Sequence, residues 1–93
     1  MTIAIKETAS KGMAFVAAEK KVLAQMTYSI ASPELIIIDH TEVDPSLKGK
    51  GMGKQLLMAI VEKARTEKFK ILPLCPFAKS VFEKDKTITD VLR

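Results

Sequence analysis

The sequence contains few of the residues on which disulfide-bonded proteins depend. Its 93 residues include one cysteine, Cys75, together with one histidine, one tyrosine and no tryptophan. A single cysteine excludes an internal disulfide bond, which is compatible with the reducing cytoplasm. We expect a cytoplasmic location, and we predict no metal site.

Long apolar runs are also missing. The densest run in a predicted strand is Leu35 to Ile38, far short of the roughly 20 residues that a membrane-spanning helix needs. The first twelve residues, MTIAIKETASKG, show no charged leader followed by an apolar core, so no signal peptide is predicted. We expect no association with membranes.

The length and charge narrow the possibilities further. Ninety-three residues leave room for one core, so residues 1–93 are predicted to form a single domain. The net charge is +4, but the lysines do not form one stripe and no aromatic residues are interleaved with them. Nucleic acid is therefore a poor candidate partner. The oligomeric state is not determined, and we favour a monomer.

Hydrophobic periodicity predicts a mixed α/β (α+β) domain with the order β-β-β-β-α-β-α. Alternating patterns indicate strands, and one apolar stripe at helical spacing indicates a long helix. A strand, a helix and a strand in succession should form a right-handed parallel unit. The strands are expected at residues 2–8, 13–19, 22–31, 35–43 and 69–75, and the helices after residue 53 and at 77–84.

The spacing also predicts which side chains share a face. In the long helix the apolar stripe consists of Leu56, Leu57, Ile60, Val61 and Ala64. The second strand places Met13, Phe15 and Ala17 on one face, and the third does the same with Val22, Ala24, Met26, Tyr28 and Ile30. In the short helix Phe77, Val81 and Phe82 should point inward, whereas residues 85–93 give weak signals. Pro73 cannot donate to a ladder, so the fifth strand should be an edge, bulged or splayed from its neighbour.

The segment KGKGMG, residues 48–53, lies between a predicted strand and the long helix. Glycines let backbone N–H groups point the same way, and a helix N-terminus adds unpaired N–H groups and partial positive charge, so the segment could bind an anion. The nucleoside-triphosphate loop is excluded because Lys48 replaces its first glycine and Gln55 its Ser or Thr. The dinucleotide fingerprint is excluded by Lys54. A simple glycine-rich turn is the remaining alternative.

With its surroundings, this segment resembles the GCN5-related N-acetyltransferase superfamily. The family motif [QR]-x-x-G-x-[GA] corresponds to residues 48–53, with lysine at the first position. The upstream residues His40-Thr41-Glu42-Val43 and the downstream Pro73-Leu74-Cys75 are similar to the HT-x-V and P-x-C segments of its compact single-domain branch. The resemblance covers roughly residues 13–84.

The resemblance implies acetyl-coenzyme A as cofactor. Its pyrophosphate would be bound by the segment Lys48, Gly49, Lys50, Gly51, Met52, Gly53 and Lys54, with Gly51 and Gly53 too close to it for a Cβ. The strands ending near Val43 and Cys75 would splay apart. The pantetheine arm would enter between them and pair with backbone groups near Glu42 and Val43.

Many members of the family use a tyrosine in the helix after the fifth strand as the general acid. Here that helix has phenylalanines, and Tyr28 lies in the third strand. The candidates left are Cys75, as nucleophile or proton donor, and His40, as a base. Glu42 is a third candidate base. Each also has an ordinary structural interpretation, Cys75 as a small buried hydrophobe and His40 as a surface residue.

Two functions remain open after these considerations. The resemblance implies a small N-acetyltransferase that transfers acetyl to an amine, for example a protein lysine or N-terminus. The turn SKG stands where the family has a helical pair that shapes the acceptor pocket. The alternative is therefore a module that binds or senses acyl-coenzyme A with little or no catalysis.

Overall fold

The computed structural model describes residues 2–93 and contains one five-stranded sheet. The strands follow the order β1-β2-β3-β4-β5; the first four pair antiparallel, and β4 pairs with β5 in parallel. The predicted topology is confirmed, and β5 is an edge strand. The bounds are Ala4–Glu7, Lys11–Ala18, Lys21–Ser32, Leu35–Val43 and Lys70–Pro73.

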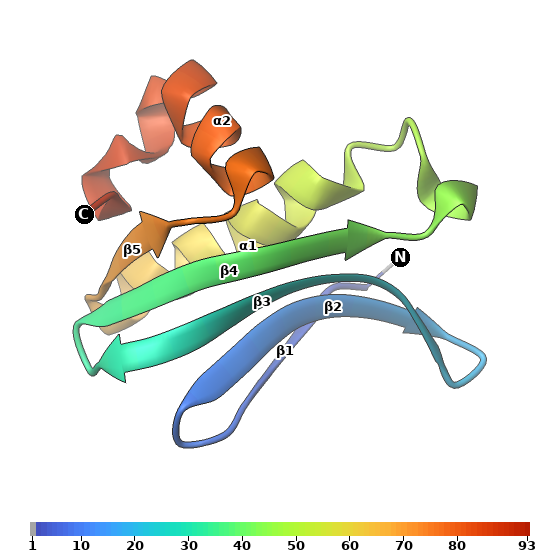
Figure 1. Ribbon diagram of the computed structural model, residues 1–93, viewed down its shortest axis with the longest axis horizontal. Helices are drawn as coiled ribbons and strands as arrows, with labels where there is room; N and C mark the ends of the chain where they lie inside the picture. The colour runs from blue at the N-terminus through green and yellow to red at the C-terminus, as the bar shows by residue number, and fades with distance from the viewer. Residues whose placement is uncertain (1) are drawn as a thin grey trace.

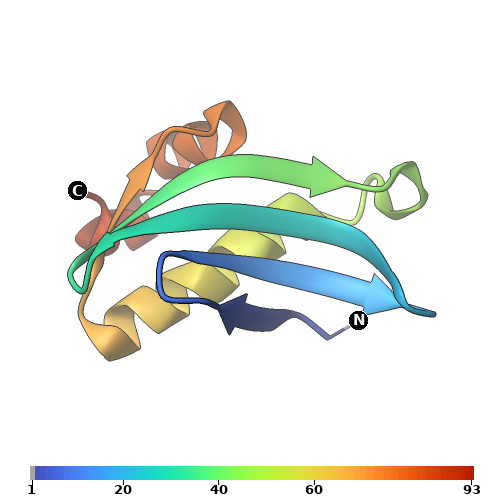
Figure 2. The ribbon, with the colours of Figure 1, turned by 60° about the horizontal axis from the view of Figure 1, so that its bottom comes forward.

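The helices lie on one face of this sheet. The long helix α1 (Met52–Glu67) crosses the back of the strands, and α2 (Pro76–Lys84) packs beside it near β5 (Figure 1). Two short 3₁₀ helices, η1 (Pro45–Leu47) and η2 (Lys86–Val91), precede α1 and follow α2. Figure 2 shows the strands in front of the helices. Within residues 2–93 no helix covers this front surface, which we call the open face.

The core lies between α1 and the sheet. All five residues of the predicted α1 stripe are at most 1% exposed. On the sheet side, Ala24, Met26 and Tyr28 of β3 share one face, as predicted, and are buried. Burial of each large apolar side chain contributes about 1.5–3 kcal/mol, which makes this layer the main source of stability. No helix in the described part of the chain is long and apolar enough to span a membrane.

In β2 Met13 and Phe15 share the open face and are half-buried, while Ala14 and Val16 face the core. One sequence prediction about side-chain direction needs correction. Phe77 does not enter the core, because 40% of it is exposed. Ala78 is buried instead, together with Val81 and Phe82 as predicted, because positions i, i+3 and i+4 share one face of a helix.

The C-terminal segment is ordered, although its sequence signals are weak. The η2 helix buries Ile88 and Val91 in the core. Arg65 of α1 donates to both carboxylate oxygens of Asp90 at 3.0 Å and to the Thr87 carbonyl at 2.9 Å. These contacts close the end of the core beside β5.

Candidate functional site

The loop after β4 is shaped by its own side chains. Asp44 caps η1 by accepting from the Ser46 amide at 2.9 Å, and this hydrogen bond holds the pKa of the Asp44 carboxyl below its ordinary value. Leu47 is only 3% exposed and anchors the loop in the core. Beyond it, the Lys50 amide donates to the Leu47 carbonyl at 3.3 Å, and the Gln55 side chain donates to the Lys50 carbonyl at 3.0 Å. The glycine segment is thus anchored before it by the buried Leu47 and after it by the hydrogen bond of Gln55.

Two glycines give this loop its curl. Gly49 and Gly51 have φ angles of +82° and +64°, in the left-handed region that other residues rarely adopt. Gly51 is the N-cap of α1, and no side chain caps the helix. The amides of Met52 and Gly53 follow in the first turn, where helix geometry provides no acceptor. They line a hollow of about 420 Å³ together with Gly49, Gly51 and the end of β4.

Gly53 has a different structural role from the other two glycines. A Cβ on Gly53 would lie 2.7 Å from atoms of the Phe77 ring, whereas one on Gly49 or Gly51 would meet nothing within 4 Å. The Phe77 ring packs over the start of α1 and would have to move to admit a side chain at Gly53. The sequence could not reveal this contact, because it joins residues 24 positions apart.

Three lysines flank the glycine segment; of these Lys48 lines the hollow, together with Asp44. Lys54 lies 3.7 Å from Asp85, and the Thr87 hydroxyl together with Lys54 lowers the pKa of the Asp85 carboxyl. Lys48 and Lys50 form no ion pair within residues 2–93. An anion at this helix N-terminus would meet both backbone N–H groups and unpaired ammonium groups.

The strands β4 and β5 separate next to the hollow. Their pairing ends at Ile38 and Pro73, although β4 continues to Val43. The Ile38 carbonyl accepts from the Leu74 and Cys75 amides at 2.9 and 3.1 Å, and the chain then turns into α2. The last five residues of β4 therefore have an edge without a partner strand in the described chain, and the space beside it is the β4–β5 gap.

The register shows which backbone groups point into this gap. The Asp44 amide donates to the Leu23 carbonyl at 2.7 Å, so alternation along an antiparallel pair turns the Glu42 groups toward β3 as well. The N–H and C=O groups of Thr41 and Val43 then point into the gap. An extended ligand could pair with them as an added strand.

Cys75 and His40 lie on opposite sides of β4. Thr41 and Cys75 are on the helix side, with Oγ1 and Sγ 3.1 Å apart, and Cys75 is 5% exposed. A β-bulge between Ile38 and His40 turns His40 to the open face. There its Nε2 lies 2.9 Å from the Glu42 carboxylate, and both side chains are more than 60% exposed. The two predicted catalytic candidates thus border the same strand end without touching.

Thr41 was missed by the sequence reasoning. Strand alternation alone could have placed it opposite Glu42, but its contact with Cys75 depends on the separation of β4 from β5. Tyr28 is far less suited to proton transfer, because burial and its hydrogen bond to Glu7 raise the pKa of the phenol well above its ordinary value. No cluster of three or more metal-ligating side chains occurs among the described residues.

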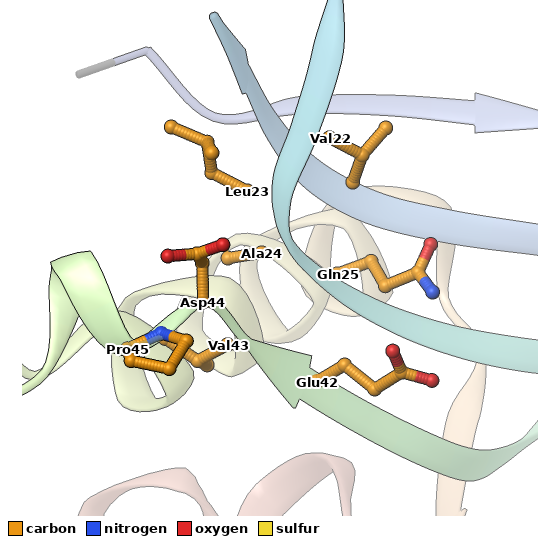
Figure 3. Close-up of a pocket in the computed structure, with 8 residues that line it drawn as sticks. All are labelled: Val22, Leu23, Ala24, Gln25, Glu42, Val43, Asp44 and Pro45. Carbon is orange, nitrogen blue, oxygen red and sulfur yellow. The ribbon is translucent and has the colours of Figure 1, made fainter.

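A second hollow, of about 310 Å³, lies at the end of β4 on the other side of Val43 and Asp44. Figure 3 shows Gln25 and Glu42 side by side, with the polar ends of both side chains pointing the same way. Leu23 and Pro45 form part of its apolar lining. Glu42 therefore belongs to the surface of β3 and β4, and its carboxylate does not enter the glycine hollow.

Comparison with known proteins agrees with this geometry. A family model described as GCN5-related N-acetyl-transferase matches residues 13–91. A GCN5-like protein from Staphylococcus aureus, solved in solution by NMR, is 40% identical; the match covers 97% of this chain and 87% of that one, with a TM-score of 0.73. Among curated protein sequences, none matches the chain.

More distant structures share the fold alone. A ribosomal-protein-alanine N-acetyltransferase from Brucella melitensis is 15% identical, with a TM-score of 0.66, and the match covers 83% of this chain and 62% of that one. A family acetyltransferase from Elizabethkingia anophelis with acetyl-coenzyme A bound is also 15% identical, with a TM-score of 0.61 and coverage of 81% and 52%. The family model and the 40% identical structure together show that this chain belongs to the GCN5-related N-acetyltransferase family.

Proposed function

We propose that this protein binds acetyl-coenzyme A in the glycine hollow and the β4–β5 gap, and transfers its acetyl group to a primary amine. One observation carries this proposal: the hollow lined by the glycine loop, Lys48 and the start of α1 adjoins the unpaired edge of β4 at Val43. The family typically uses acetyl-coenzyme A, and a structure of the same fold holds it. When bound, the cofactor supplies an activated acetyl thioester.

The residues present fit such a ligand. The amides of Gly49, Gly51, Met52 and Gly53, with the side chains of Lys48 and Lys50, would hold the pyrophosphate. The backbone groups of Thr41 and Val43 would pair with the pantetheine arm. The thioester would then lie near Cys75, at the point where β5 leaves the ladder.

We infer that Cys75 carries the acetyl group during transfer. Its sulfur forms a bond to the acetyl carbon, and its proton leaves with the coenzyme A thiol. The nitrogen of a neutral amine then attacks the carbonyl carbon of the acetyl group on Cys75, the bond from that carbon to the sulfur breaks, and the sulfur regains a proton that the amine nitrogen loses. Thr41 would orient the sulfur, and His40, held by Glu42, would take a proton from the incoming ammonium group.

The alternative is a module that senses acyl-coenzyme A. It is supported by the open acceptor side and by the phenylalanine Phe82 in the helix where many relatives have a tyrosine. Release of free thiol from acetyl-coenzyme A, measured with and without a panel of primary amines, separates the two. Amine-dependent release supports the transferase, whereas tight cofactor binding without release by any amine supports the sensor.

A further inference from the structure

A groove of about 470 Å³ crosses the open face from β1 to β4. Its floor is the paired backbone of Gly12 and Tyr28. Gly12 has no side chain, and the Tyr28 ring lies on the helix side, where a Cβ on Gly12 would come within 2.5 Å of it. Both residues leave the open face empty at this position, which is why the groove exists.

The groove is bordered by residues from four strands. Lys6, Met13 and Thr27 are successive partners in the sheet register and form one side. Lys11 is paired with Ser29 and lies on the other side. Asp39 closes the β4 end, where its carboxylate accepts from the Thr27 hydroxyl at 2.5 Å and the Ser29 hydroxyl at 3.3 Å.

Charge is distributed unevenly along this groove. Asp39 is at one end, Lys11 and Lys6 are toward the other, and none of the three forms an ion pair within residues 2–93. Glu7 also lines the lysine end, where its carboxylate accepts from the Tyr28 hydroxyl. Lys6 additionally lies over the Phe15 ring, 5.4 Å from its centroid. Because neighbouring strands are about 4.8 Å apart, the backbones of Lys11 and Asp39 are separated by about 10 Å. The floor between them is largely apolar.

The acidic end of the groove adjoins the β4–β5 gap. Asp39 follows Ile38, whose carbonyl accepts from the Cys75 amide. Asp39 and Cys75 therefore lie on opposite faces of the sheet at the point where the two strands separate. A ligand in the groove with a cation at Asp39 would present that cation to the mouth of the gap.

We propose that this groove binds the acceptor, and that the acceptor is an aliphatic primary amine with an anionic group at its other end. The ammonium group would bind Asp39, the methylene chain would lie over Gly12 and Met13, and the anionic group would bind Lys11. This inference rests on the proposed transferase function. The same chemistry occurs in an ω-amino acid and in a peptide lysine close to an acidic residue.

The test is a set of amide NMR titrations of the protein with coenzyme A present. The probe is 6-aminohexanoate, and hexylamine and hexanoate each lack one of its charges. Shifts are expected at Gly12, Met13 and Asp39 with 6-aminohexanoate, and both single-charge probes should bind at least about tenfold more weakly. A second titration uses a peptide with lysine and glutamate two residues apart. Comparing its affinity with that of 6-aminohexanoate distinguishes a peptide acceptor from a free ω-amino acid.

Variants make the assignment specific. Asp39→Asn and Lys11→Gln should each weaken 6-aminohexanoate about tenfold, and the exposed Lys86→Gln should leave its affinity unchanged. Equal binding of hexylamine, unaltered affinity in both groove variants, or shifts confined to other parts of the sheet would each overturn the proposal. The same spectra report coenzyme A at Gly49 to Gly53, so failure of the proposed cofactor site is seen separately.

Discussion

The Thr41 hydroxyl and the Cys75 thiol meet across the β4–β5 gap, with Oγ1 and Sγ 3.1 Å apart. This contact joins two residues 34 positions apart in the chain and exists because β5 leaves its ladder after Pro73. It holds the thiol beside the unpaired edge of β4. The proposed chemistry depends on this position.

Replacing Cys75 tests its chemical role. Cys75→Ala removes the sulfur but little volume, so we expect acetyl transfer to fall at least about a hundredfold while coenzyme A affinity stays within about twofold. Thiol-release kinetics and calorimetry measure the two quantities. Thr41→Ser keeps the hydroxyl and is the matched control, with little expected loss. Normal turnover in Cys75→Ala would remove Cys75 from the mechanism.

The glycine loop is tested by a substitution at the helix N-cap. Gly51→Val places a β-branched residue at a φ of +64°, and the strain of about 1–3 kcal/mol should displace the loop amides. Coenzyme A affinity is expected to fall about tenfold or more. Calorimetry on folded protein checks this, with circular dichroism as the control for folding. An unchanged dissociation constant would show that this loop does not bind the pyrophosphate.

Two other glycines should differ in their effect on stability. Gly12→Ala directs a methyl group at the Tyr28 ring, which is 1% exposed and held by Glu7, so we expect a loss of about 1–3 kcal/mol. Gly53→Ala meets the end of the Phe77 ring, which is 40% exposed and can move, so its loss should be smaller. Denaturant unfolding compares the two variants. The reverse order would show that Tyr28 is less constrained than its contacts indicate.

The C-terminal ion pair predicts a pH dependence. The hydrogen bond from Arg65 lowers the pKa of the Asp90 carboxyl in the folded state. Its stabilisation is therefore present above the ordinary carboxylate value of about 3.9 and is lost as pH falls through the lowered one. Asp90→Asn should reduce the melting temperature at pH 7, and the difference from wild type should shrink below about pH 4.

The control for this prediction is Glu83→Gln, because Glu83 makes no ion pair within residues 2–93. Its melting temperature should follow that of wild type throughout. A difference for Asp90→Asn that is constant from pH 7 to pH 3 would exclude the Arg65 pair as its cause.

Periodicity was sufficient to predict the strands and the buried face of α1. The α1 stripe from Leu56 to Ala64 repeats at helical spacing, so burial follows from local pattern alone. The parallel β4–β5 pair followed from the handedness of the connection, and Pro73 indicated the edge. The family resemblance added the glycine motif at residues 48–53. Helix α1 begins inside this motif, at Met52.

Features that depend on contacts between distant residues could not be predicted. The bulge that turns His40 away from Cys75 inserts one residue into β4, and nothing in the run from Ile38 to Thr41 marks it. Phe77 points to Gly53. The C-terminal segment, whose sequence signals are weak, is held by the hydrogen bonds of Arg65. In each case tertiary packing decides the direction of a side chain that local pattern leaves open.

The most direct test of the cofactor site is an amide NMR titration of the full chain with coenzyme A. We expect the largest shifts at Gly49, Gly51, Met52 and Gly53, with a second group at Thr41 and Val43 where the pantetheine arm would pair with β4. If coenzyme A leaves these resonances unmoved, the loop does not bind the pyrophosphate, and the proposed acetyl transfer is contradicted.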